Sequence, residues 1–248
     1  MMPFGFLAMV VLIAFLVETA AGFGGTVVTL SLASQLMPVD DVLARFLPVN
    51  LLLSAYVVLR HRRHVALRLL LARILPFMGL GVLAGFFLAR TASPGWLKIV
   101  FALFVLVLSA AELRSLASTR PRDAKLPVPI AAAALVAAGV LHGLFACGGP
   151  LAVWVVGRDV QDKGVFRATL SALWLVLNAF LVAGFAVDSK IQVTTLRESG
   201  LLLVPLAVGI AAGERVHARL SPERFRLAVF VLLFVAALAL LIRSAPFG

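Results

Sequence analysis

Eight apolar runs, each close to the length that crosses a lipid bilayer as a helix, dominate this chain. A membrane helix pairs its backbone groups within itself, so it needs no partner strand. Hydrophobic residues make up 62% of the 248 residues and charged residues only 13%, which is too apolar for a soluble domain. The sequence therefore predicts an all-α polytopic membrane protein with about 8 to 10 membrane segments. The runs are 3–22, 43–59, 74–89, 95–111, 128–146, 165–187, 200–213 and 225–242.

The sequence also contains a weak internal repeat. One set of small and polar residues recurs 124 positions later, and a second set recurs 128 positions later. Related halves of this kind are typical of secondary transporters. We therefore divide the chain into an N-terminal repeat, 1–122, and a C-terminal repeat, 123–248. The matching positions are Ala14, Glu18, Gly22 and Gly24-Gly25 with Ala138, His142, Ala146 and Gly148-Gly149, and Gly81, Gly85, Ser93-Pro94 and Lys98 with Gly209, Gly213, Ser221-Pro222 and Arg226.

Two topologies fit the apolar runs, and they differ in the short segments 26–37 and 150–157. If these segments re-enter, each half has four spans and the halves are parallel; if they cross, each half has five and the halves are inverted. Relative to the basic loop at 60–73, the two topologies place 158–167 and 215–226 on different sides. Crossing segments put sixteen basic residues inside and six outside, whereas re-entrant segments give twelve and ten. Since basic residues favour the cytoplasmic side, the charges predict inverted repeats.

The short segments are too short for a complete helical span. Twelve residues of α-helix cover only about 18 Å, so we expect a broken half-helix with extended chain, shielded by neighbouring helices. Each half is then predicted to contain about four full helices and one half-helix.

A glycine-rich break precedes each half-helix. A helix start offers unpaired amide donors and a partial positive charge, and glycine lets an anion approach the backbone. Two such starts predict a cradle for a small anion. The alternative is that the glycines only permit close helix packing. The predicted substrate-binding residues at the breaks are Gly24, Gly25, Thr26, Cys147, Gly148 and Gly149.

A titratable residue stands before each break, Glu18 in the first half and His142 in the second. An intramembrane carboxylate usually faces a cavity or a partner, and histidine titrates near neutral pH. We predict that Glu18 and His142 carry a coupling proton. A structural hydrogen-bonded pair, or two separate buried polar groups, is the alternative.

Four further residues are predicted to bind substrate. Arg45 and Arg167 follow the short segments, and a guanidinium group suits planar oxyanions. Asn50 and Asn178 lie within apolar runs and must find partners there. The alternatives are lipid head-group anchors for the arginines and interhelical hydrogen bonds for the asparagines.

Other short patterns predict packing rather than chemistry. Gly81 and Gly85, and likewise Gly209 and Gly213, have the spacing of close helix crossings. The formal charge of +11 comes from basic residues near helix ends, which favours membrane lipids over nucleic acid as partners. The sequence contains no phosphate loop, zinc motif or nucleophile elbow. We therefore expect no cofactor, no metal site and no catalytic residues.

Taken together, these features resemble the sulfite exporter TauE/SafE family of bacterial permeases. The resemblance covers nearly the whole chain and rests on a combination of short motifs. The second half departs from the family pattern at Cys147 and Pro150. The motifs are Gly22-Phe23-Gly24-Gly25, Ala146-Cys147-Gly148-Gly149, the basic stretch 60–65 and Phe166-Arg167-Ala168-Thr169-Leu170.

The resemblance implies transport of sulfur oxyanions or organosulfonates, such as sulfite and sulfoacetate, across the bacterial inner membrane. We expect a proton-coupled secondary transporter whose two halves rock against each other. An anion channel or uniporter, a membrane-embedded enzyme and an assembly subunit are the alternatives. The sequence does not choose between a monomer and a homodimer.

Overall fold

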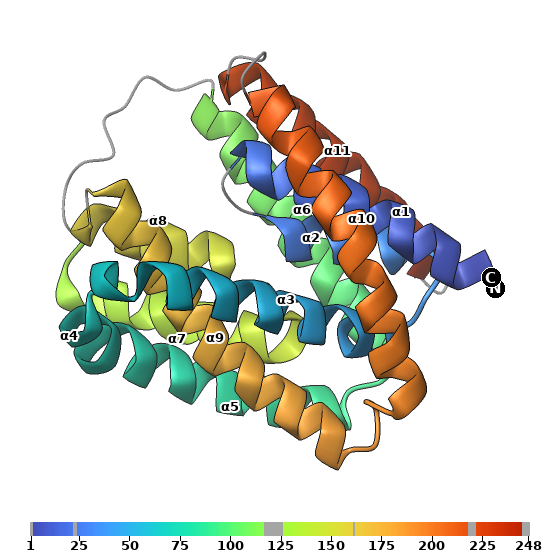
Figure 1. Ribbon diagram of the computed structural model, residues 1–248, viewed down its shortest axis with the longest axis horizontal. Coiled ribbons are helices and arrows are strands. Elements are labelled where there is room, and N and C mark those ends of the chain that lie inside the picture. Colours follow the sequence, from blue (N-terminus) through green and yellow to red (C-terminus); the bar gives the residue numbers. More distant parts are fainter. Residues whose placement is uncertain (1, 22–23, 117–125, 161, 218–221, 245–248) are drawn as a thin grey trace. The chain divides into compact units, whose positions relative to one another are not determined.

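A computed structural model describes residues 2–21, 24–116, 126–160, 162–217 and 222–244, and these residues form helices and short connections without a strand (Figure 1). The helices are α1 (Met2–Ala21), α2 (Gly25–Ala33), α3 (Val39–His61), α4 (Leu67–Leu69), α5 (Leu75–Thr91), α6 (Pro94–Leu116), α7 (Val128–Phe145), α8 (Gly149–Asp159), α9 (Lys163–Val187), α10 (Val193–His217) and α11 (Pro222–Ser244). A 3-10 turn, η1 (Arg62–His64), precedes α4, and a π turn, η2 (Leu70–Ile74), leads into α5.

The helices have the length and composition of a multi-pass membrane protein. Within the described ranges, seven stretches are long and apolar enough to cross a membrane, and α1 adds the shorter apolar stretch Phe4–Thr19. Large apolar side chains are exposed along them, for example Val107, Val204 and Ile242 at 67–68%. Such side chains suit contact with lipid. The prediction of an all-α polytopic membrane protein is confirmed.

The two short segments are half-helices, as the sequence predicted. α2 has 9 residues and α8 has 11, whereas the helices around them have 18 or more. After α2 the chain forms turns over 34–37 rather than the extended chain that the sequence predicted. The side chain of Gln35 stabilises these turns by donating to the carbonyl oxygens of Ser31 (3.3 Å) and Ala236 (2.9 Å).

The chain packs into two compact units that each combine helices from both predicted repeats. The first unit comprises residues 1–43, 92–120 and 200–248, and the second comprises 44–91 and 121–199. The boundaries between the units therefore fall inside α3 and α10 as well as in two connections. The boundary predicted between the repeats, after residue 122, lies outside the described residues. The division into repeats is a statement about sequence and remains a prediction.

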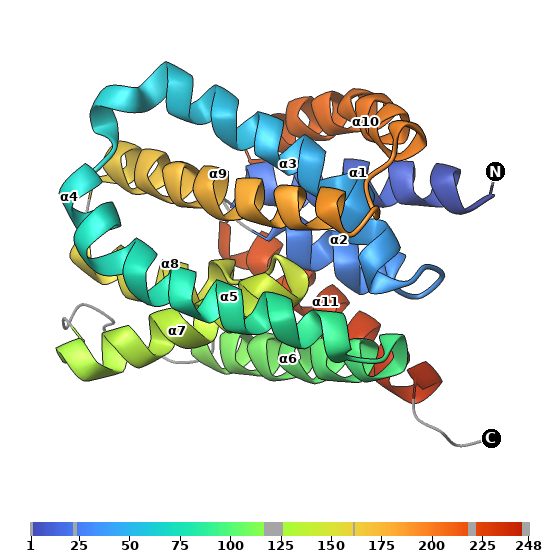
Figure 2. The same cartoon turned by 90° about the horizontal axis from the view of Figure 1, so that it is seen from below.

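In the second unit, α5 and α7 pack side by side and run in the same direction (Figure 2). Gly139 lies against the backbone of Met78, and one turn later Gly143 lies against Val82 and Phe86. Contacts that advance together along both helices define a parallel pair. Glycine on both sides lets the two backbones approach closely.

α9 runs in the same direction as α5. Near the start of α9, Thr169 Oγ1 accepts a hydrogen bond from the backbone N–H of Ala66, just before α4 (3.0 Å). Just past the end of α9, Asp188 Oδ2 accepts from Arg90 Nε near the end of α5 (3.0 Å). Because α5 is parallel to both helices, α7 and α9 point the same way.

The parallel arrangement of α7 and α9 requires the chain to return through α8. α8 ends beside the π turn, where Asp159 Oδ2 lies 3.0 Å from Arg73 Nη1. Segment 158–167 therefore lies at the same end of the second unit as the basic loop 60–73. The topology with crossing segments and five spans in each half requires 158–167 and 60–73 to lie at the same end. The topology with re-entrant segments would put these two stretches at opposite ends. In the second half, the placement of 158–167 is thus the one that the inverted topology predicts, and the inverted arrangement of the repeats remains a prediction.

The glycine crossings confirm the prediction of close helix packing at both glycine pairs. A Cβ atom at Gly81 on α5 would overlap the carbonyl oxygen of Val136 on α7. At the matching positions in the first unit, Gly209 on α10 meets the carbonyl oxygen of Leu12 on α1. Gly85 with Val140 and Gly213 with Leu16 form the next matching pair of contacts. Each repeat therefore supplies a glycine-bearing helix that packs on the first helix of the other repeat.

Candidate functional site

The first break, between α1 and α2, lies in the first unit and holds an acidic side chain. Gly24 has φ 104°, a backbone conformation that favours glycine, and α2 begins at Gly25. The carboxylate of Glu18 lies directly over Gly25, because a Cβ atom at Gly25 would overlap Glu18 Oε2. Glu18 therefore places a negative charge at the positive end of α2. Gly22 and Phe23, which belong to the predicted motif, lie outside the described residues.

α2 also carries hydroxyl groups that the sequence analysis did not select. Thr29, Ser31 and Ser34 are fully buried, and their hydroxyl oxygens have no hydrogen-bond partner within the part of the chain that the structure describes. Thr26, the predicted substrate ligand, is half-buried at the second position of the helix. The sequence pattern that could have identified these hydroxyl groups is the recurrence of Ser and Thr along an otherwise apolar half-helix.

The second break, between α7 and α8, lies in the second unit and is built differently. Ala146 ends α7 with φ 52°, and its N–H donates to the carbonyl oxygen of His142 (2.7 Å). Cys147 and Gly148 follow and are buried. A Cβ atom at Gly148 would overlap the carbonyl oxygen of Ala138, so glycine is required by the packing there. α8 then starts at Gly149 with Pro150 in the first turn, a position that suits proline because no amide donor is needed there.

His142 occupies the place that Glu18 holds in the first repeat, but its surroundings are uncharged. Its ring stacks on Trp174 of α9, with ring centroids 5.2 Å apart and planes 15° apart. Trp174 also lies 3.9 Å from the position of a Cβ atom at Gly149. Among the described residues, no other atom beyond the chain neighbours comes within 4 Å of that position. The start of α8 therefore faces an aromatic ring rather than a carboxylate.

Asn178 joins this group from α9, one turn after Trp174. Asn178 is 0% exposed and His142 is 2% exposed. The two side chains are neighbours without a hydrogen bond of normal geometry, and none of their four nitrogen and oxygen atoms is paired in the described structure. Buried polar groups are rarely left in this state, because each lost hydrogen bond is costly. The pair is thus a group of donors and acceptors with unused capacity.

The two predicted arginines are not brought together. Arg45 Nε lies 2.6 Å from Glu198 Oε2, and the carbonyl oxygen of Arg45 accepts from the hydroxyl of Ser199 (2.8 Å). Arg167 is exposed near the start of α9, which lies at the His64 end of α3. The sixteen residues from Arg45 to the end of α3 correspond to about 24 Å of helix. Arg45 also lies in the second turn of α3 rather than at its start.

The predicted site residues thus separate into two groups. Glu18, Gly24, Gly25 and Thr26 gather at the first break, whereas His142, Cys147, Gly148, Gly149 and Asn178 gather at the second. Asn50 lies half-buried in α3, five residues beyond Arg45. Sequence reasoning missed Trp174, although its position one turn before Asn178 places both on one face of α9.

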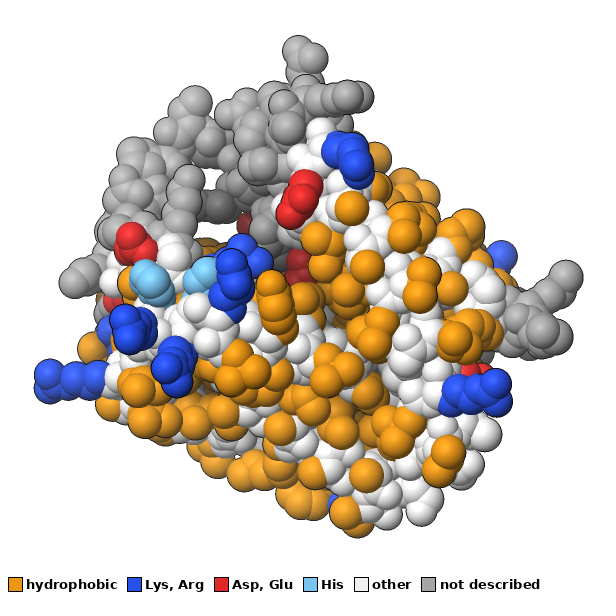
Figure 3. Space-filling model, viewed as in Figure 1, with side chains coloured by type: hydrophobic (Ala, Val, Ile, Leu, Met, Phe, Trp, Pro, Cys, Tyr) orange, Lys and Arg blue, Asp and Glu red, His pale blue; other side chains and the backbone are white. Residues whose placement is uncertain are grey.

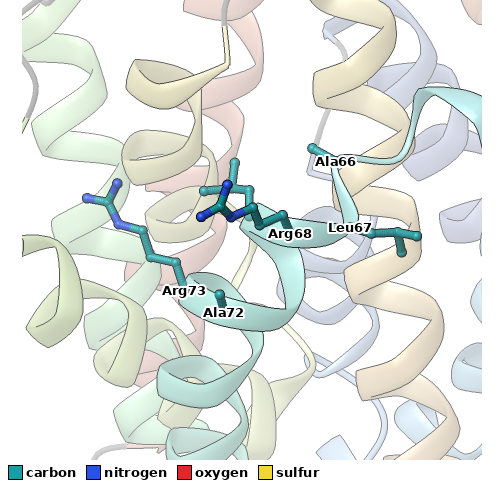
Figure 4. Close-up of a pocket in the computed structure, with 6 residues that line it drawn as sticks. Ala66, Leu67, Arg68, Ala72 and Arg73 are labelled. Carbon is teal, nitrogen blue, oxygen red and sulfur yellow. The ribbon is translucent and has the colours of Figure 1, made fainter.

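The basic loop forms a separate surface at one end of the second unit. In Figure 3, Lys, Arg and His side chains gather there, and the neighbouring face is largely apolar. A shallow hollow of about 570 Å³ lies at the π turn, lined by Ala66, Leu67, Arg68, Leu69, Ala72 and Arg73. Arg68 and Arg73 extend to one side of this turn and Leu67 to the other (Figure 4). Exposed arginines beside apolar surface suit the lipid head-group region.

Comparison with known proteins identifies the family. The sequence matches the family described as Sulfite exporter TauE/SafE over residues 7–240. The chain belongs to the TauE/SafE family. The probable inner membrane transporter protein TsaS of Comamonas testosteroni is similar, at 26% identity over 168 residues, which cover 67% of this chain and 69% of that protein. No solved structure matches.

The TauE/SafE match confirms the resemblance drawn from the motifs. The matched range includes both breaks and both glycine crossings, so these features lie within the family's own region of sequence. With its membrane-spanning helices, this family member is a multi-pass inner-membrane transporter.

Proposed function

We propose that this TauE/SafE protein is a proton-coupled secondary transporter of small sulfur-containing anions such as sulfite or organosulfonates. The observation that carries the proposal is the second break, where a half-buried helix start lies near the buried, unpaired polar side chains of His142 and Asn178. The family description, which names sulfite export, supports the choice of a sulfur oxyanion.

The start of α8 suits an anion because its first amides have no partner within the helix. The first hydrogen bond within this turn runs from the N–H of Ala152 to the carbonyl oxygen of Gly148 (3.1 Å). Pro150 has no N–H, which leaves Gly149 and Leu151 as the donors ahead of it. These donors are neutral, so an anion can bind and leave without breaking an ion pair with a buried cation.

Glu18 is the proposed proton carrier. Its carboxylate is costly to charge in an apolar setting, and the positive end of α2 offsets part of that cost. Protonation removes the attraction between Glu18 and the start of α2. A change in protonation is therefore linked to a change in the conformation of the first break.

Alternating access would move the two compact units rather than the two sequence repeats. The helices that continue from one unit into the other, α3 and α10, each contain a proline close to the boundary, Pro48 and Pro205. A proline inside a helix removes the hydrogen bond to the carbonyl four residues earlier, here those of Ala44 and Leu201. Both freed carbonyls lie within two residues of a unit boundary. We propose that α3 and α10 bend there.

The test is uptake of labelled sulfite into proteoliposomes, with and without a pH gradient, and with taurine and sulfoacetate as competitors. Saturable uptake that the gradient accelerates would support the proposal. Saturable uptake whose rate does not change with the pH gradient would indicate a uniporter and would contradict the coupling role of Glu18. Absence of uptake and of competition would refute transport of this substrate class.

A further inference from the structure

We infer that, of the two breaks, the one at the start of α8 is the site for an SO3-bearing anion, and that Glu18 fills the equivalent place at the start of α2. This inference rests on the proposed transport function and assigns its substrate site to one break. Both breaks have a helix start, so the difference between them depends on which side chain lies over it.

At the second break, hydrogen-bond donors from three helices lie near one another at the start of α8. The amides of Gly149 and Leu151 come from α8 itself. The ring of His142 adds an N–H from α7, and the side-chain amide of Asn178 adds further donors from α9. His142 and Asn178 are more than nine-tenths buried and unpaired in the described structure, so they gain hydrogen bonds when an anion binds.

Trp174 links this group to the helix start. Its ring stacks on His142, and its Cζ2 atom lies 3.9 Å from the position of a Cβ atom at Gly149. An anion at Gly149 would therefore lie beside an apolar wall, with polar donors next to it. The three oxygens of an SO3 group can accept from such a cluster of donors. Sulfite and organosulfonates share this group, so the site recognises the chemistry common to both.

At the first break, the same position is already occupied. The carboxylate of Glu18 lies over Gly25, where an incoming anion would have to approach α2. A second negative charge there would face repulsion from Glu18 in addition to the steric conflict. The first break therefore holds the protein's own anion, and the second accepts the substrate.

Trp174 provides a direct readout of binding that does not depend on transport. The chain contains three tryptophans, so the W96F/W154F double variant leaves Trp174 as the reporter. We would titrate the full-length, detergent-purified protein with sodium sulfite and with sulfoacetate, using sodium acetate as the control. Saturable change in fluorescence with the two sulfur anions, and none with acetate, is expected.

Three substitutions in this background test the placement. H142F keeps the stacked ring and removes its N–H groups, and N178L keeps the shape of the side chain and removes its polar atoms. Each should raise the half-saturating sulfite concentration about tenfold or more, since a hydrogen bond to a charged group is lost. G149A adds a methyl group that fits against Trp174 yet stands where the anion must approach, so it should weaken binding without unfolding the protein.

Binding to Glu18→Gln protein decides between the two breaks. The inference is supported if the half-saturating sulfite concentration of E18Q protein lies within about twofold of that of the W96F/W154F protein. Loss of the Glu18 charge leaves the second break intact. The inference is overturned if E18Q abolishes the fluorescence response while H142F, N178L and G149A retain it. It is also overturned if sulfite uptake is saturable but Trp174 gives no response; the transport function then stands. Absence of both uptake and response would refute the proposed function itself.

Discussion

The two helix breaks occupy matching positions in the repeat but differ in what lies over the helix start. At the first break, Glu18 places its carboxylate on Gly25 at the start of α2. At the second, His142 stacks on Trp174, and no carboxylate of the described residues lies over Gly149 at the start of α8. The comparison teaches that two glycine-rich helix starts at matching positions in the sequence can differ in the side chain that lies over them, and under our proposal this difference assigns coupling to the first break and binding to the second.

The glycine crossings show a milder version of the same divergence. Gly81 and Gly85 on α5 face glycines on α7, whereas Gly209 and Gly213 on α10 face Phe15 and Thr19 side chains on α1 among their nearest neighbours. Both crossings therefore bring two backbones together, and in the first unit the side chains of Phe15 and Thr19 also lie against the glycines.

The largest effect that we expect to distinguish the roles of the two breaks is in the E18Q variant, where sulfite accumulation should no longer be coupled to the pH gradient. With one pH unit across the membrane, transfer of one proton per anion can support about a tenfold difference in accumulation. Glutamine cannot carry the proton, so this tenfold contribution should disappear while sulfite binding persists. Sulfite accumulation in proteoliposomes measures it. If E18Q protein still accumulates sulfite in response to the gradient, the role assigned to the first break is wrong.

A second effect distinguishes two adjacent glycines at the second break. G148A should destabilise the protein by about 1–3 kcal/mol, because its methyl group meets the backbone carbonyl of Ala138. G149A should change stability by about 0.5 kcal/mol or less, because its methyl group makes only an ordinary contact with Trp174. Thermal unfolding in detergent compares the two. Equal losses would mean that the start of α8 is packed as tightly as the end of α7.

A smaller effect is expected at the first break from G25A. Its methyl group would displace the carboxylate of Glu18 from the start of α2, and the carboxylate is the end of a movable side chain. Loss of the helix-end interaction, about 0.3–1 kcal/mol, corresponds to about a two- to fivefold loss of gradient stimulation. The initial rate of sulfite uptake under a pH gradient tests this. A wild-type response in G25A protein would show that the contact between Glu18 and α2 is not part of coupling.

The smallest effects are expected for the two arginines. R45A breaks a partly exposed ion pair with Glu198, a contribution of about 0.2–1 kcal/mol. R167A removes an exposed charge near the lipid head-group region. Each variant should change the half-saturating sulfite concentration for uptake by about twofold or less. A tenfold change in either would return that arginine to the substrate site and weaken the contrast between the breaks.

The sequence alone determined the elements of this protein and the places where they break. Long apolar runs predict helices because a backbone in lipid must pair its own polar groups, and these helices are present. The glycine pairs marked the starts of α2 and α8. The spacing of Gly81 and Gly85 predicted a close crossing because only a missing Cβ lets two backbones meet. All of these features follow from local spacing.

Only the tertiary structure decided which residues act together. It paired Arg45 with Glu198, set Trp174 against His142, and assembled compact units from helices of both repeats. These contacts join residues that are far apart in the chain, and nothing in the spacing along one helix specifies which face of another helix it meets. The position of the Glu18 carboxylate on Gly25 likewise depends on how α1 and α2 fold against each other. The glycine pairs set the two helix starts, and side-chain packing made them different.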